Sequence, residues 1–244
     1  MHLHLPKPLH GWRAFAGEVG IIVIGVLIAL GAEQIVETVH ERQIAAETRA
    51  NIKSEIESDL AGMKLRLAAE PCIQRRLQQL HSIVEQWSRT GSYTTPNFIG
   101  SSPRQGLEFV RYDAAQSAGR LALLPSDEQD RVGALADALK NWQSLGRQEG
   151  LPWARLQILM SGAASLTQTD RTLVRDALQS AEFLDDSVRK DAMEVLPWAE
   201  DNGFKPDLRE VNESTRHFTP AICLPLDASA AEVARASRRP GARG

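Results

Sequence analysis

The sequence predicts an all-α protein, with an N-terminal transmembrane helix that runs into a long helix, then a helical hairpin and an irregular helical bundle. Three observations carry this prediction. An uncharged run lies near the N-terminus, apolar residues after it recur at spacings of three and four, and the alternating pattern of strands is almost absent. With 244 residues, 43% of them hydrophobic, the chain is long enough for one sizeable helical domain plus an anchor.

The opening segment is a candidate membrane span. The uncharged run, residues 19–32, would reach only about 21 Å as a helix, which is short of a hydrocarbon core about 30 Å thick. If the helix begins at Trp12, residues 12–32 reach about 31 Å and place Trp12 and Phe15 at interfacial depth. We therefore predict a transmembrane helix over residues 12–32.

Two features inside this segment are candidate functional positions. Glu18 is a carboxylate within the predicted span, where charged residues are by default functional, but its closeness to the boundary favours a simple membrane-boundary residue. Ala16 with Gly20 and Gly25 with Ala29 form two pairs of small residues at a spacing that lets helix backbones approach closely. These pairs predict helix packing and allow a homodimer through the transmembrane helix.

A cleaved signal peptide is the main alternative to an anchor. Lys7 and Arg13 precede the apolar run, and Ala29 and Gly31 have the small side chains that a cleavage site requires. The helical pattern nevertheless continues without a breaker through residues 33–39, as expected for an anchor that feeds a stalk. We prefer the anchor, while a cleaved signal and a buried core helix stay open.

The charges beside the apolar run predict its orientation. Lys7 and Arg13 lie on the N-terminal side, whereas Glu33, Glu37 and Glu41 come first on the other side. The positive-inside rule then places the N-terminus in the cytoplasm and the bulk of the chain in the periplasm. The expected location is the bacterial inner membrane, with a single pass.

Whether the two cysteines are free or bonded depends on this location. Cys72 and Cys223 are about 150 positions apart and form no CxxC motif or Cys/His cluster. In a cytosolic protein they would be unrelated buried thiols, whereas in an oxidising compartment they would form one disulfide. Closing so long a loop would stabilise the fold by about 4 to 5 kcal/mol in the chain-entropy description.

The N-terminal sequence also carries a resemblance. The stretch "PKPLHGWRAFAGEVGIIVIGVLIALGAEQIVE", residues 6–37, resembles the N-terminus of a group of uncharacterised proteobacterial single-span membrane proteins. In that group a Trp- and Arg-containing lead and a Gly-Glu pair precede a Val/Ile-rich transmembrane segment. Residues 112–129 and 223–226 are similar to the group in a looser way. The resemblance implies an anchored helical protein and carries no known activity or binding residue.

Two apolar stripes follow the span. The first belongs to a helix over residues 33–69, and Pro71 fits the first turn of a second helix, so the two helices predict an antiparallel hairpin. Residues 90–106 are rich in turn-forming residues and would lie at the tip of this hairpin. The stripes comprise Ile52, Ile56, Leu60, Met63 and Leu67, and then Ile73, Leu77, Leu80, Val84 and Trp87.

Later helices are predicted by caps and periodicity. Ser126 to Gln129 have the form of a capping box, which would open a helix that stops near Gly146 to Gly150. Thr167 or Thr169 could cap the last long helix, which continues to Pro197. Other predicted segments are a short helix over 113–119, a helix over 152–166 with Leu156, Leu159 and Ala163 inward, an inward face of Val174, Leu178, Ala181, Leu184, Val188, Ala192 and Val195, and an extended segment over 204–227.

The predicted organisation has five parts in chain order. A lead precedes the transmembrane helix, and a helical stalk connects that helix to one helical domain, which is periplasmic in the preferred orientation. A flexible basic tail ends the chain; a basic arm that touches anionic lipid or RNA is its alternative interpretation. The boundaries are 1–11, 12–32, 33–51, 52–227 and 228–244.

Little in the sequence predicts chemistry. His2, His4 and His10 could suggest a metal cluster, but they occupy a short lead with no carboxylate nearby, so we expect no metal site. Glu213, Ser214 and His217 are the residue types of a catalytic triad, but a working triad is rarely supplied by one short segment. We expect no catalytic residues, no cofactor and no metal.

These observations favour a membrane-anchored helical protein-interaction or accessory module of the bacterial cell envelope. The expected partners are the lipid bilayer and an unidentified protein, and the small-residue pairs allow a second copy bound through the transmembrane helix. A net charge of −3 argues against nucleic acid, which usually requires a basic surface. The alternative is a membrane-tethered enzyme with an atypical site between helices, and a soluble helical protein is the third option.

Overall fold

The computed structural model describes residues 12–102, 106–207 and 221–236. All regular elements in these ranges are helical, which confirms the predicted all-α class. The α-helices are α1 (Trp12–Ala68), α2 (Glu70–Thr90), α3 (Val110–Ser117), α4 (Ser126–Leu156), α5 (Gln168–Asp201) and α7 (Ala230–Ala236). Short 3₁₀ turns are η1 (Arg120–Leu123), η2 (Gln157–Ser161), η3 (Ala163–Ser165) and η4 (Ala221–Cys223).

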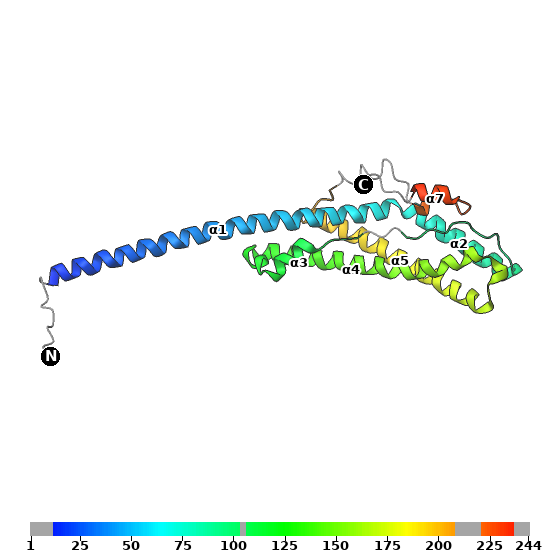
Figure 1. Cartoon of the computed structure of the whole chain (residues 1–244), viewed down its shortest axis with the longest axis horizontal. Helices are drawn as coiled ribbons and strands as arrows, with labels where there is room; N and C mark the ends of the chain where they lie inside the picture. Colours follow the sequence, from blue (N-terminus) through cyan, green and yellow to red (C-terminus); the bar gives the residue numbers. More distant parts are fainter. Residues whose placement is uncertain (1–11, 103–105, 208–220, 237–244) are drawn as a thin grey trace.

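The N-terminal half of α1 projects alone from the rest of the molecule (Figure 1). The helix has 57 residues, which corresponds to about 86 Å. Its most apolar window has a mean hydropathy of 2.3 and none of that window is buried. Within the described ranges, α1 is the one helix long and apolar enough to cross a membrane, as the sequence predicted for residues 12–32.

The chain does not reverse direction between α1 and α2. Ala69 keeps a right-handed helical conformation (φ −83°, ψ −9°), and the amide of Ile73 donates to its carbonyl. Pro71 lies in the first turn of α2, as predicted, and the two helices continue as one bent rod (Figure 1). The antiparallel hairpin expected from these two segments is therefore wrong in position, because the helical pattern resumes across Ala69 without a turn.

The helical hairpin lies instead between α4 and α5 (Figure 1). The predicted stop near Gly146 to Gly150 is wrong, because Glu149 and Trp153 are buried and their packing keeps α4 helical through Pro152 to Leu156. The helix predicted over 152–166 is consequently the last turns of α4 followed by η2 and η3.

Of the two predicted caps of the last long helix, Thr167 and not Thr169 is the one in the structure. Thr167 caps α5 in a capping box, in which its hydroxyl accepts from the amide of Asp170 at 3.2 Å. Ser126 is already inside α4, Pro125 occupies the cap position, and the Gln129 side chain donates to the carbonyl of Leu124 at 2.8 Å. The capping box predicted for Ser126 to Gln129 is therefore wrong, since the helix begins one residue earlier than that motif requires.

The bundle has two apolar cores along its length. The proximal core, nearer the projecting half of α1, joins α1, α3, α4 and α5, and the distal core joins α2, α4 and α5 with the segments on either side of them. The predicted stripes are confirmed in both, except that Leu67 and Val195 are only partly buried and Asp185 is buried in place of Leu184. Buried stripe residues are Ile52, Ile56, Leu60 and Met63, Ile73, Leu77, Leu80, Val84 and Trp87, and Val174, Leu178, Ala181, Val188 and Ala192.

The connection after α2 packs along the bundle instead of forming a free tip. Tyr93 and Ile99 are buried, and the Tyr93 hydroxyl donates to the Leu159 carbonyl at 2.9 Å. The amides of Asn97 and Phe98 donate to the carbonyl of Leu226 at 2.8 and 3.0 Å. This connection and the C-terminal segment therefore hold each other in place.

Candidate functional site

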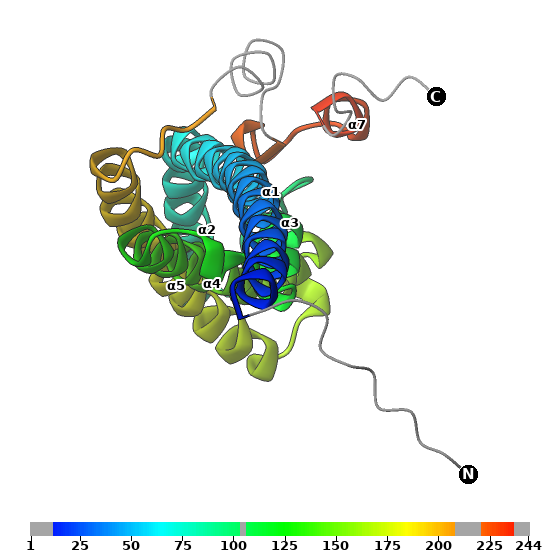
Figure 2. The same cartoon turned by 90° about the vertical axis from the view of Figure 1, so that its left-hand side faces the viewer.

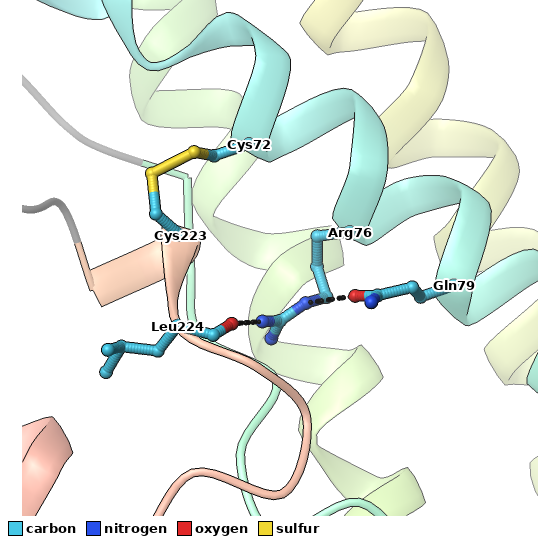
Figure 3. Close-up of a disulfide and its surroundings, with 5 residues drawn as sticks. All are labelled: Cys72, Arg76, Gln79, Cys223 and Leu224. Carbon is cyan, nitrogen blue, oxygen red and sulfur yellow. Dashed lines mark hydrogen bonds between the residues drawn. A yellow bond between two sulfur atoms is a disulfide. The ribbon is translucent and has the colours of Figure 1, made fainter.

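The disulfide joins the first turn of α2 to the end of η4. Cys72 and Cys223 are bonded with a Cα–Cα distance of 4.8 Å across 151 positions of sequence, as expected for an oxidising compartment (Figure 3). This bond connects the C-terminal segment to the point where α1 bends into α2. Ile222 beside it is buried, so the bonded segment forms part of the distal core.

Arg76, one turn after the bridged cysteine, completes this attachment (Figure 3). Its side chain is 1% exposed, and its guanidinium donates to the carbonyls of Phe98 (3.1 Å), Ile99 and Leu224 and to the amide oxygen of Gln79 (3.0 Å). Burial lowers the pKa of Arg76 to about 10. A single cation thus donates to backbone carbonyls of two separate segments.

A second buried arginine lies close to the bend between α1 and α2. Arg66 is 1% exposed and pairs with Asp185 of α5 at 2.5 Å, Glu70 of α2 at 2.8 Å and Glu149 of α4 at 3.2 Å. Burial lowers the pKa of Arg66, but its carboxylate neighbours outweigh burial and leave the pKa above its ordinary value. Burial raises the pKa of Asp185 to about 6 against the lowering effect of Arg66.

The carboxylates of this Arg66 cluster have further donors. The Gln74 amide donates to Asp185 at 2.5 Å, and the Ser102 hydroxyl donates to Glu149 at 2.7 Å. The Trp153 indole also donates to Glu149, at 3.4 Å. The single guanidinium of Arg66 therefore links carboxylates of three other helices to α1, although its Nε is buried without a partner.

Acidic residues of α1 position the start of α3. Glu55 accepts hydrogen bonds from the amides of Arg111 (2.8 Å) and Tyr112 (2.9 Å), where the helix N-terminus favours a negative charge. Asp59, one turn further, accepts from the amide of Glu108 at 3.2 Å, while its other oxygen is buried without a partner. These residues border a polar cavity of about 450 Å³. In the described part of the chain, no three His, Cys, Asp or Glu side chains are arranged to hold a metal ion.

A shallow groove of about 490 Å³ lies between α2 and α5. His81 faces Glu85 at 3.3 Å and Glu182 at 3.7 Å, and all three side chains are exposed. At the other end of the groove Arg175 donates to the Ser88 hydroxyl at 3.1 Å. The groove therefore presents exposed charges of both signs to solvent and has no buried reactive group.

The membrane-segment candidates are all on the exposed part of α1. Glu18 is exposed, and a side chain added at Gly20 or Gly25 would meet no atom of the same chain. The five-residue step from Gly20 to Gly25 rotates about 140° around the helix, so the Ala16/Gly20 pair and the Gly25/Ala29 pair lie on different faces. One flat contact with a neighbouring helix cannot use both pairs.

The other sequence candidates lie outside the described residues; they are His2, His4 and His10 in the lead and Glu213, Ser214 and His217 near the C-terminus. The Arg66 cluster and Arg76 were not among the predicted positions, although one signal for them is present in the sequence. Arg66 and Arg76 lie three residues after Met63 and Ile73, and Asp185 four after Ala181, which are core spacings.

Comparison with known proteins gives no match to a protein family, to a curated protein or to a solved structure.

Proposed function

We propose that this chain is a single-pass protein of the bacterial inner membrane, with its N-terminus in the cytoplasm and its helical bundle in the periplasm, where it acts through protein contacts. The observation that carries this proposal is the exposure of the apolar half of α1. Ile21, Ile22, Leu27 and Ile28 are between 62% and 75% exposed, although they are among the most apolar residues of the chain.

A lipid bilayer accounts for this exposure. Each aliphatic side chain of this kind gains about 1.5 to 3 kcal/mol when it leaves water, so leaving a row of them in solvent is strongly unfavourable. The backbone of α1 is hydrogen-bonded within the helix, as the hydrocarbon interior requires. The bundle begins near the end of the stalk, where Thr48 and Ile52 become buried.

The disulfide supports placement of the bundle outside the cytoplasm. Bonds of this kind persist in oxidising compartments and are rare where thiols are kept reduced. Cys72 and Cys223 belong to the bundle and follow the apolar run in sequence, whereas Lys7 and Arg13 precede that run. The charge asymmetry around the apolar run and the disulfide thus favour the same orientation.

Protein contact is a better explanation than catalysis for this bundle. In the Arg66 cluster the buried arginine is paired with three carboxylates, and the groove between α2 and α5 is open and lined by exposed charged side chains. An enzyme would need polar groups that converge on a sheltered cavity. The tethered enzyme remains the alternative, and a substrate-sized ligand bound in the groove would favour it.

Membrane retention and thiol accessibility test the proposal together. In the unmodified chain we expect a membrane pellet resistant to alkaline carbonate. Maleimide-PEG should modify Cys72 and Cys223 only after denaturation and reduction. The double substitution Ile24→Arg/Leu27→Arg should release the chain from the membrane, whereas Glu37→Arg should not, because residue 37 lies in the stalk.

Two outcomes would contradict the proposal. Thiols that react in denatured, unreduced protein but are protected in intact spheroplasts would place the bundle in the cytoplasm. A chain that lengthens when signal peptidase is inhibited would be a secreted protein and not an anchored one.

A further inference from the structure

Helix α1 has two different sides where it emerges from the membrane segment. One side turns toward the bundle, and burial begins there at Ile44, Ala45 and Thr48 and continues through Ile52 and Ile56. The opposite side remains exposed along the same length. In Figure 2, which looks along α1 from its N-terminal end, α5 lies to one side of α1.

The exposed side carries an uncharged heptad pattern. Six of the nineteen residues 33–51 are charged, yet none of the six falls on this pattern. Glu18 and Lys53 occupy the equivalent positions one heptad before Gly25 and after Ala46, so charged residues end the pattern on both sides. We call its members the α1 seam: Ile22, Gly25, Ala29, Ala32, Val36, Val39, Gln43, Ala46 and Ala50, all of them exposed.

We propose that the α1 seam binds the α1 seam of a second copy of this chain, so that two anchors and two stalks form one continuous parallel coiled coil. The proposal rests on the membrane anchoring proposed above, because a shared membrane aligns the two chains in the same direction. The seam is about 42 Å long from Ile22 to Ala50 and crosses from the membrane segment into the stalk.

Side-chain size along the seam matches the surroundings of each part. Gly25, Ala29 and Ala32 lie within the membrane segment, where association depends on close backbone approach. Val36 and Val39 lie beyond it, where they are 70% and 48% exposed and where burial of apolar surface drives association. Of the two small-residue pairs, the proposal therefore uses Gly25/Ala29 and leaves Ala16/Gly20 on another face.

The charges that flank the seam favour a second copy over an unrelated helix. Arg42 precedes Glu47 by five residues, which is the spacing of an interhelical ion pair in a parallel coiled coil. Neither side chain forms an ion pair within the described part of the chain, whereas nearby Arg49 pairs with Glu128 at 2.6 Å. A two-fold axis would create two Arg42–Glu47 pairs, and Gln43 within the seam would help to fix the register.

The bundle does not obstruct this contact. Ile52 is about 160° around the helix from Val36, and Thr48 is about 140° from Gln43, so each bundle would lie on the outer side of its own stalk. The groove between α2 and α5 is far from the seam along the chain and would stay accessible.

Cysteine cross-linking in membranes tests the seam. Single substitutions Val36→Cys and Val39→Cys should give disulfide-linked dimers on mild oxidation, because the native cysteines are already bonded to each other. Glu37→Cys and Glu41→Cys are matched controls one or two residues away on the outer face, and they should stay monomeric. Equal dimer yields at all four positions would overturn the seam.

Exchanging the charges of Arg42 and Glu47 tests the register of the seam independently. In the Val39→Cys chain, Arg42→Glu should lower the dimer yield about fivefold, because two attractive pairs become repulsive. Adding Glu47→Arg to the same chain should restore the yield, which a merely structural effect of either substitution would not do. Failure of the exchange to restore the yield would overturn the assigned register.

The two proposals fail in distinguishable ways. Each variant is first assayed in the carbonate-washed membrane pellet. A chain absent from the pellet would overturn both anchoring and the seam. A chain retained in the pellet, with no difference between seam and control positions, would overturn the seam alone.

Discussion

Asp59→Asn should remove a large part of the pH dependence of the bundle's stability between pH 4 and 7. Asp59 is 6% exposed on α1, and one of its oxygens accepts from the Glu108 amide at 3.2 Å. The other oxygen is buried without a partner. Glu55 and Glu108 place further negative charge beside it, while Arg111 and Asp207 border the adjoining cavity.

The sign of this pH dependence follows from the raised pKa of Asp59. Burial, aided by the charges of Glu55 and Glu108 and opposed by the backbone hydrogen bond, raises the pKa of Asp59 from 3.8 to about 7. The folded chain therefore holds this proton more tightly than the unfolded chain does. The resulting stabilisation is complete below about pH 4 and is lost as the pH rises to 7.

The size of the expected change in stability follows from the same pKa shift of Asp59. About three pKa units correspond to about 4 kcal/mol, at about 1.4 kcal/mol per unit. Water in the adjoining cavity of about 450 Å³ can solvate the ionised carboxylate in part, so we expect about 2 kcal/mol. Asparagine keeps the acceptor oxygen and cannot ionise, so the variant should be more stable than the original chain at pH 7.5.

Denaturant unfolding of the full chain in a nonionic detergent measures this difference. Fluorescence of the buried Trp87, Trp142 and Trp153 reports on both cores. The matched control is Asp113→Asn, an exposed carboxylate that pairs with Lys140 at 2.7 Å and should leave the pH profile almost unchanged. An Asp59→Asn profile parallel to that of the original chain would refute the reasoning.

Three further predictions concern the buried contacts. Arg66→Met should destabilise the bundle by about 3 kcal/mol, because the buried carboxylates of Glu149 and Asp185 lose their cation; in denaturant unfolding the control Lys64→Met, which removes an exposed ion pair with Glu200, should change stability much less. Cys223→Ser should lower the free energy of unfolding by about 4 kcal/mol and abolish the mobility difference between reduced and non-reduced samples. Arg76→Met should leave the carbonyls of two segments without their donor, and faster amide exchange at residues 97–98 and 226–228 would confirm it.

Much of the fold could be predicted because it depends on local periodicity. The stripes from Ile52 to Trp87 and the cap at Thr167 are properties of single helices, and the structure confirms them. The direction of α2 was not predictable in this way, since a bent helix and an antiparallel hairpin have the same apolar spacing. Only the helical conformation of Ala69 distinguishes them, and the Arg66 contacts beside it join residues that are far apart in the sequence.

The wrong predictions for the end of α4 and for the inward face of α5 also arise from contacts between helices. Gly146 and Pro152 are helix-breaking residue types, but burial of Glu149 and Trp153 stabilises α4 across them. Leu184 and Asp185 are adjacent, and hydrophobicity alone assigns the inward position to leucine. Asp185 takes that position because Arg66 on α1 supplies the opposite charge, which no local pattern of α5 contains.

The Arg66 cluster lies at the bend at Ala69, between the apolar segment of α1 and the C-terminal segment of the chain. Helix α1 runs without interruption from the apolar segment to the bend at Ala69, where the cluster joins it to α4 and α5. On the other side of the bend, Cys72 and Arg76 connect α2 to the C-terminal segment. Because both sides of the bend are held by buried charges or a covalent bond, the bend cannot act as a loose hinge. A rotation of the stalk, such as a change in seam pairing would produce, must therefore move α2 and the groove beside it as one body with α1.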